Sequence, residues 1–136
     1  MHLPDERGTT RILAYPEVGA AEVWAPGVCG ELVQGMLDGI PFLVTCPIDF
    51  FARARVTLGE SDAGSAHVEA PEDCPKAAAA LKSTLEHLGL RLGRGEMGAR
   101  LELSSPIPRG KGMGSSSADV AATIGATALA LGQELS

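Results

Sequence analysis

A glycine- and serine-rich stretch, Pro106–Asp119, constrains the fold of this chain more than any other segment. It places Gly110, Gly112 and Gly114 directly before three serines at positions 115–117. Glycine lets backbone N–H groups turn toward a ligand with no Cβ in the way. A helix that begins at the serines adds unpaired N–H groups and the positive end of its dipole. The stretch therefore predicts an anion-binding loop between a strand and a helix, of the kind that holds phosphate.

Two well-known phosphate-binding loops do not fit this spacing. No Gly-Lys-Ser/Thr closes the stretch, so it is not a Walker A loop, and the three glycines lack the G-x-G-x-x-G spacing of dinucleotide-binding folds. An ordinary glycine-rich turn with a helix-capping serine remains an alternative at this point, because such turns are common where a strand leads into a helix.

The periodicity of the remaining chain predicts one α+β (two-layer α/β) domain over residues 1–136. Residues 1–19 are polar and predict a loose lead-in. Pro26-Gly27 and Gly39 indicate turns, and Pro47 indicates a strand break. A helical stripe starts at Pro75 and is expected to stop at Gly89, and a second helix follows the serines, with Ala118, Ala122, Gly125 and Leu129 on its buried face. Alternating apolar residues and apolar runs predict strands over residues 21–25, 42–46, 52–58, 66–70 and 99–104. We expect a mixed, mainly antiparallel sheet with the helices on one face.

Composition excludes several classes of partner. A net charge of −6 and an aromatic content of 4% argue against nucleic acid, which needs a basic face and stacking surfaces. The chain has no apolar run of membrane-spanning length, so no membrane partner is expected. Its three cysteines include no C-x-x-C pair, which argues against a disulfide framework or structural zinc and favours a reduced, cytoplasmic setting.

The full pattern of the loop resembles a known family. Pro108-x-x-x-Gly112-Met-Gly-Ser-Ser-Ser-Ala118 is similar to the second motif of the GHMP kinases, with Met113 in place of the usual Leu and Ser117 in place of an Ala. Upstream, Pro26-Gly-Val-Cys-Gly-Glu31 resembles the family's first motif. Val28 and Leu32 stand where some members carry a basic residue and a histidine, so the role of that basic residue is not transferred to this chain.

Three further segments narrow the resemblance to one branch. The segments are Pro26-Gly-x-Cys-Gly-Glu-Leu-x-Gln-Gly35, Thr45-Cys-Pro-Ile-Asp-Phe50 and Gly112-Met-x-Ser-Ser-x-Ala-Asp119, and they look like the branch that phosphorylates the hydroxyl of L-threonine in cobalamin synthesis. The resemblance implies a fold like domain 2 of ribosomal protein S5, with ATP and Mg²⁺ as cofactors. Two alternatives stay open: another small-molecule GHMP kinase, acting on homoserine or a sugar, and a non-catalytic S5-like module that binds a partner.

The same resemblance implies roles for individual residues. Ser116 would bind Mg²⁺ through its hydroxyl, Glu31 would contact Mg²⁺ or the acceptor, and both are candidate catalytic residues. For Glu31, a surface or fold-stabilising carboxylate is the alternative. Asp49 would contact the substrate, with a turn residue as the alternative, and Asp119 is expected to complement the helix dipole. Cys29 and Cys46 are expected to be buried thiols, and His67 and His87 surface residues. The residues expected to hold ATP are Pro108, Gly110, Lys111, Gly112, Met113, Gly114, Ser115, Ser116, Ser117 and Ala118. For Lys111, a solvated loop lysine is the alternative.

The length of the chain carries one more expectation. Members of the family are longer and have a C-terminal domain with a third glycine-rich motif that completes the acceptor site. We therefore expect residues 1–136 to be the N-terminal ATP-binding domain without the C-terminal domain, with little or no activity alone. Apolar surface left uncovered in this way would favour self-association into a homo-oligomer.

Overall fold

The computed structural model describes residues 3–4, 10–11, 17–60, 67–91 and 97–133. Two short strands near the N-terminus, β1 (Leu3–Pro4) and β2 (Thr10–Arg11), pair with each other, so the predicted lead-in is not wholly irregular. The main sheet is built on two long strands, β3 (Glu17–Leu37) and β4 (Ile40–Glu60), which form one antiparallel hairpin. Asp38 and Gly39 turn the chain between them with positive φ angles of 51° and 81°, as tight hairpin turns require. The turn predicted at Gly39 is confirmed.

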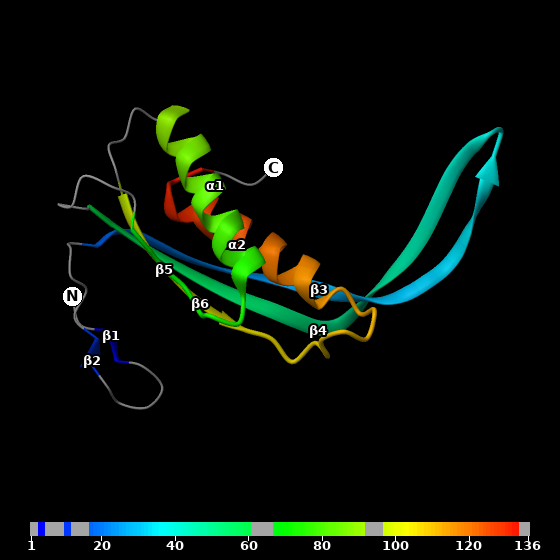
Figure 1. Cartoon of the computed structure of the whole chain (residues 1–136), viewed down its shortest axis with the longest axis horizontal. Coiled ribbons are helices and arrows are strands. Elements are labelled where there is room, and N and C mark those ends of the chain that lie inside the picture. The colour runs from blue at the N-terminus through cyan, green and yellow to red at the C-terminus, as the bar shows by residue number, and fades with distance from the viewer. Residues whose placement is uncertain (1–2, 5–9, 12–16, 61–66, 92–96, 134–136) are drawn as a thin grey trace.

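The main sheet has four strands in the order β3-β4-β6-β5. Strand β6 (Met97–Ser104) runs antiparallel to β4, while the short β5 (Val68–Glu69) runs parallel to β6. Helices α1 (Pro75–Arg91) and α2 (Ser115–Ala130) lie on the same face of this sheet (Figure 1). The predicted mixed, mainly antiparallel sheet with helices on one face is confirmed. The strand expected over residues 66–70 is shorter in the structure, where β5 covers Val68–Glu69 and residues 67 and 70 lie outside it. Residue 66 lies outside the described residues.

Small side chains let α2 lie close to the sheet. Ala118, Ala122 and Ala126 are buried, and Ala52 and Ala54 of β4 are fully buried in the same core. A larger α2 face would push the helix away from the strands, since protein interiors are close-packed. The prediction of the buried face was wrong at its last position. Leu129 is 37% exposed, and the neighbouring Ala130 and Leu131 are buried instead.

Strands β3 and β4 continue past the helices as a two-stranded arm, residues 28–47, which projects from the body of the domain (Figure 1). The turn predicted at Pro26-Gly27 and the break predicted at Pro47 were wrong, because both strands run through these positions. The prolines are accommodated by an irregularity in the pairing. Pro26 pairs with Phe51 and Val28 pairs with Pro47, so three residues of β4 stand opposite Gly27.

Large apolar side chains are exposed along this arm. Cys29 and Cys46, expected to be buried, are exposed on it as well. The exposed large apolar residues of the arm are Leu32, Val33, Met36, Leu37, Ile40, Phe42, Leu43 and Val44. The exposed apolar surface is therefore concentrated on the arm.

Helix α1 begins at Pro75 as predicted but does not stop at Gly89. It continues to Arg91, so the glycine lies inside the helix. Leu81 and Leu85 point into the core, which confirms part of the predicted apolar stripe. Within the described residues, neither helix is long and apolar enough to cross a membrane.

Candidate functional site

The glycine-rich loop joins β6 to α2, as the sequence predicts. Gly110, Gly112 and Gly114 all have left-handed backbone angles, with φ of 67°, 70° and 69°. Residues with a Cβ rarely adopt this conformation, so glycine at these alternate positions is what allows the loop its backbone path. A Cβ at Gly110 or Gly112 would meet no atom within 4 Å, so the loop is open to a ligand on this side.

The backbone N–H groups at the N-terminus of α2 are available to a hydrogen-bond acceptor from a ligand. The residue before the helix is Gly114, and among the described residues no side chain makes a capping hydrogen bond there. The alternative of a capping serine is therefore wrong for this loop. The first intrahelical bond from the serine segment runs from the N–H of Ala118 to the carbonyl oxygen of Gly114 at 2.9 Å. The preceding N–H groups of the first turn have no intrahelical acceptor, and they carry the positive end of the dipole.

The two segments that resemble family motifs meet at the start of this helix. The N–H of Val28 donates to the carbonyl oxygen of Met113 at 2.9 Å. A Cβ at Gly27 would lie 2.8 Å from the same oxygen, and a Cβ at Gly114 would lie 3.0 Å from Cγ2 of Val28. Glycine at both positions therefore lets strand β3 and the loop approach each other to backbone distance.

The predicted acidic residues lie in different places. Asp49 is exposed in the irregular segment of β4 that stands opposite Gly27. The residues that flank this segment, Pro47 and Phe51, pair with Val28 and Pro26 of β3, and Val28 contacts the loop. Glu31 is exposed farther along the arm, opposite Thr45. Neither lines the cavity that contains Ser116. His67 and His87 are exposed, as expected.

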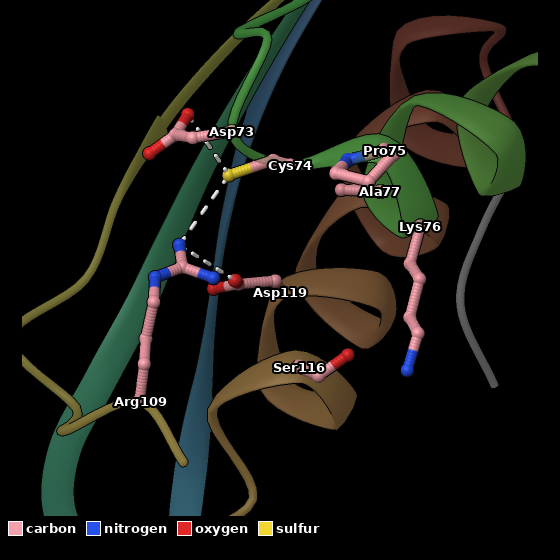
Figure 2. Close-up of a pocket in the computed structure, with 8 residues that line it drawn as sticks. All are labelled: Asp73, Cys74, Pro75, Lys76, Ala77, Arg109, Ser116 and Asp119. Atoms are coloured by element: carbon pink, nitrogen blue, oxygen red, sulfur yellow. Dashed lines mark hydrogen bonds and ion pairs between the residues drawn. The ribbon is translucent and has the colours of Figure 1, made fainter.

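A cavity of about 200 Å³ lies between the N-termini of the two helices. Figure 2 shows Lys76 reaching down from α1 toward the Ser116 hydroxyl on one side, and Arg109 rising from the loop on the other. The cavity is lined by Asp73, Cys74, Pro75, Lys76, Ala77, Arg109, Ser116 and Asp119.

Three segments are joined inside this cavity by the Arg109 guanidinium. Its Nη2 lies 3.2 Å from Oδ2 of Asp119 and donates to Sγ of Cys74 at 3.3 Å (Figure 2). The thiol of Cys74 in turn donates to Oδ1 of Asp73 at 3.5 Å. The loop, the segment before α1 and the second turn of α2 are therefore linked through polar contacts.

Asp119 is the buried member of this group. The residue is only 3% exposed, and Oδ1 has no hydrogen-bond partner within the described part of the chain. Burial raises the pKa of this carboxyl above its usual value, although the neighbouring Arg109 charge works in the opposite direction. Burial likewise raises the pKa of the Cys74 thiol. The expectation that Asp119 complements the helix dipole was wrong, because the first turn of α2 holds no acidic residue.

Sequence reasoning missed Arg109, Cys74 and Lys76 as members of one site. Arg109 sits inside the recognised motif, but its partner Asp119 is ten positions away, and no helical or strand period connects them. Cys74 and Lys76 come from a segment far from the loop in sequence. Only the packing of α1 beside α2 brings them together.

The donors present fit a nucleotide phosphate and a hard cation. Backbone N–H groups and the cationic Lys76, Arg109 and Lys111 suit anionic oxygens. Across the described ranges, no three His, Cys, Asp or Glu side chains are grouped to hold a metal ion. A Mg²⁺ ion here would therefore use the partly buried Ser116 hydroxyl together with phosphate and water oxygens, which is how Mg²⁺ is often bound.

Comparison with known proteins agrees with this geometry. Residues 76–136 match the family model "GHMP kinases N terminal domain". An L-threonine kinase of Citrobacter freundii is 34% identical over 110 residues, which cover 81% of this chain and 35% of that protein. An L-threonine kinase of Salmonella typhimurium is 36% identical over 113 residues, covering 81% of this chain and 34% of that protein. The chain thus spans about a third of the length of these relatives.

The fold is also similar to that of solved kinase structures. The structure of the Methanococcus jannaschii mevalonate kinase superposes with a TM-score of 0.60 at 17% identity, over 89% of this chain and 43% of that one. At this identity the likeness concerns the fold alone. The motifs and the sequence relatives agree that this chain belongs to the GHMP kinase family, and its residues 76–136 match the model of the family's N-terminal domain.

Proposed function

We propose that this chain is the nucleotide-binding part of a kinase that transfers the γ-phosphoryl group of ATP to the hydroxyl of L-threonine. The products would be O-phospho-L-threonine and ADP. The observation that carries the nucleotide part is the uncapped N-terminus of α2, which follows three left-handed glycines. The acceptor is proposed from the two relatives, whose names state L-threonine kinase activity.

The residues of the loop have distinct parts in this proposal. The N–H groups of Gly112, Gly114, Ser115 and Ser116 would hold phosphate oxygens, and the exposed Lys111 would add positive charge. When bound, Mg²⁺ neutralises charge on the transferred phosphoryl group and orients it. The Ser116 hydroxyl would place its oxygen toward that ion.

The phosphoryl acceptor would be contacted by one of the two predicted carboxylates, Asp49 or Glu31. Asp49 is the better candidate of the two predicted carboxylates, because its segment stands opposite Gly27 beside the loop, while Glu31 lies farther out on the arm. Its carboxylate would accept a hydrogen bond from the acceptor's ammonium or hydroxyl. We propose that residues 1–136 bind nucleotide but turn over little by themselves, since the relatives that carry the activity are much longer.

Calorimetric titration with Mg·ATP and Mg·ADP tests the nucleotide part. We expect binding to the wild-type chain and roughly tenfold weaker binding for Ser116→Ala, because hydrogen bonds to charged groups contribute about 1.5–3 kcal/mol. Ser83→Ala is the matched control, since Ser83 is an exposed serine on α1 away from the loop. Absence of heat with the wild-type chain would reject the proposal.

A separate pair of variants tests how much the backbone of the loop contributes to nucleotide binding. Gly114→Ala introduces a Cβ at positive φ that also approaches Val28, and it should abolish measurable binding. Gly132→Ala carries the same kind of strain at φ 80°, but a Cβ there meets nothing within 4 Å and lies past the end of α2. Equal loss of nucleotide affinity in both variants would mean that the loop has no special part.

The acceptor is tested by phosphoryl transfer from labelled ATP to a panel of L-threonine, L-serine, L-homoserine and galactose. The Citrobacter freundii relative serves as the positive control. Joined to the C-terminal part of that relative, the chain should phosphorylate L-threonine in preference to the other alcohols. Transfer to homoserine or galactose but not to threonine would refute the substrate and favour another small-molecule GHMP kinase.

A further inference from the structure

We propose that Arg109 and Asp119 act as a positioning pair that holds the glycine loop in its nucleotide-binding shape before any ligand arrives. This inference rests on the proposed nucleotide-binding function and adds to it two residues that need not touch the nucleotide. Arg109 stands at the beginning of the loop, and Asp119 stands one turn inside the helix that ends it. Their contact therefore closes the loop onto its own helix.

The loop has few other restraints. Gly110 and Gly112 are exposed, and the Cβ that each lacks would have met nothing within 4 Å. Glycine loses more conformational freedom on ordering than any other residue, so such a loop is costly to fix at the moment of binding. One hydrogen bond, from Val28 to the Met113 carbonyl, fixes the far end of the loop. The contact between Arg109 and Asp119 fixes the near end.

The geometry of Arg109 suits a positioning role. Nη2 alone makes both polar contacts, to Oδ2 of Asp119 and to Sγ of Cys74. The side chain is 52% exposed, whereas the side chain of Asp119 is 4% exposed. The loop is thus tied to a fixed, buried point on α2 and, through Cys74, to the beginning of α1.

The state of Asp119 indicates that the pair does not serve stability. A carboxylate buried with Oδ1 unpaired within the described residues is a costly choice for a core position. Buried ion pairs replaced by apolar residues often leave stability unchanged or improved. A role in shaping the loop explains why the charged pair is kept at this place.

Hydrogen–deuterium exchange of residues 110–114 in the nucleotide-free chain tests the proposal directly. Arg109→Met should speed exchange in the loop about tenfold or more, and the affinity for Mg·ADP should fall by a similar factor, in the usual range for coupled sites. Arg100→Met is the matched control. It removes an Arg–carboxylate contact, to Glu69 at 2.9 Å, that lies away from the loop.

A double variant separates positioning from simple stability. Arg109→Met alone leaves the buried Asp119 carboxylate unpaired and should lower the unfolding free energy. Arg109→Met/Asp119→Ala removes both charges, and its unfolding free energy should recover toward the wild-type value. Its loop exchange should stay fast and its nucleotide affinity low. If exchange and affinity recover together with stability, the pair is only structural and the proposal is wrong.

The remaining outcomes are also decisive. Loop exchange in Arg109→Met that matches wild type would overturn the proposal. A loss of affinity by Arg109→Met that is clearly larger for Mg·ATP than for Mg·ADP would also overturn it, since that pattern indicates direct contact with the last phosphate. If wild type binds no nucleotide but exchange still rises in Arg109→Met, the proposed function fails while the positioning of the loop stands.

Discussion

The backbone N–H of Val28 donates a hydrogen bond to the carbonyl oxygen of Met113 across 2.9 Å. These residues belong to the two segments that resemble separate family motifs and lie 85 positions apart in the chain. One strand of the sheet is thus bonded directly to the loop before α2. The register of β3 and the conformation of the loop therefore depend on each other.

A Cβ at Gly27 should break this dependence. In Gly27→Ala the added carbon would lie 2.8 Å from the Met113 oxygen and close to Ile107, so backbone would have to move. We expect a loss of about 1–3 kcal/mol in the free energy of unfolding, in the range of other overpacked sites, measured by urea denaturation. Nucleotide affinity should fall in the same variant.

Gly89→Ala is the control with the opposite sign. Gly89 lies inside α1, without positive φ, and a Cβ there meets nothing within 4 Å. Alanine should stabilise the helix by about 0.5–1 kcal/mol, because it loses less backbone entropy on folding. A Gly27→Ala variant as stable as Gly89→Ala would show that the strand and the loop are not closely apposed.

The loop was predictable because its causes are local. Gly110, Gly112 and Gly114 need only their own backbone freedom to adopt left-handed angles, and the helix start at Ser115 follows from the same stretch. The sheet and the two helices were likewise visible in the apolar periods. Leu129 was misplaced because the buried face of α2 rotates near its end, where Ala130 and Leu131 take over.

The arm and the buried pair were not predictable because their causes are not local. Pro26 and Pro47 ordinarily end strands, and only the irregular pairing between β3 and β4 lets both strands continue. Arg109 and Asp119 meet because the loop folds back onto α2, and Cys74 joins them because α1 packs beside α2. Neither residue type nor spacing along the chain carries that information.

Overpacking should reveal how closely α2 lies on the sheet. Ala122 is fully buried, so Ala122→Leu should cost about 1–3 kcal/mol or more of the free energy of unfolding. The neighbouring Ala121 is exposed, and Ala121→Leu should change it by no more than about 0.5 kcal/mol. Thermal or urea denaturation of the two variants compares them directly. Similar values for both would mean that the helix is not tightly packed.

The arm should make the isolated chain associate with itself at high concentration. Large apolar side chains are exposed on it, including Met36, Leu37 and Ile40 at its tip, each 69% exposed. Exposed apolar patches of this kind favour association with a second copy. Light scattering after size-exclusion chromatography should show a mass that rises with concentration. Met36→Lys/Ile40→Lys should lower that mass, whereas Lys substitutions at the exposed Ala79 and Glu86 of α1 should not.

Asp119 should give the free energy of unfolding an unusual dependence on pH. Burial raises its pKa above the ordinary value of about 3.9, Asp73 adds to this, and the charge of Arg109 opposes it. Between the ordinary and the raised pKa, the native state binds more protons than the unfolded state. The stability contributed by this group is therefore present at low pH and is lost as pH rises through the raised pKa.

The measurement is the difference in unfolding free energy between wild type and Asp119→Asn, taken from pH 7 down to about pH 4. We expect it to shift in favour of wild type as pH falls. Glu22→Gln is the contrasting control, because a hydrogen bond from Arg53 lowers the pKa of Glu22. For Glu22 the stabilising contribution is present above its ordinary pKa and is lost as pH falls through the lowered one, so its curve should move the other way. If the pH dependence for Asp119→Asn follows that for Glu22→Gln, the effect of Arg109 outweighs that of burial. The folded state would then favour the charged form of Asp119, and its pKa would be lowered.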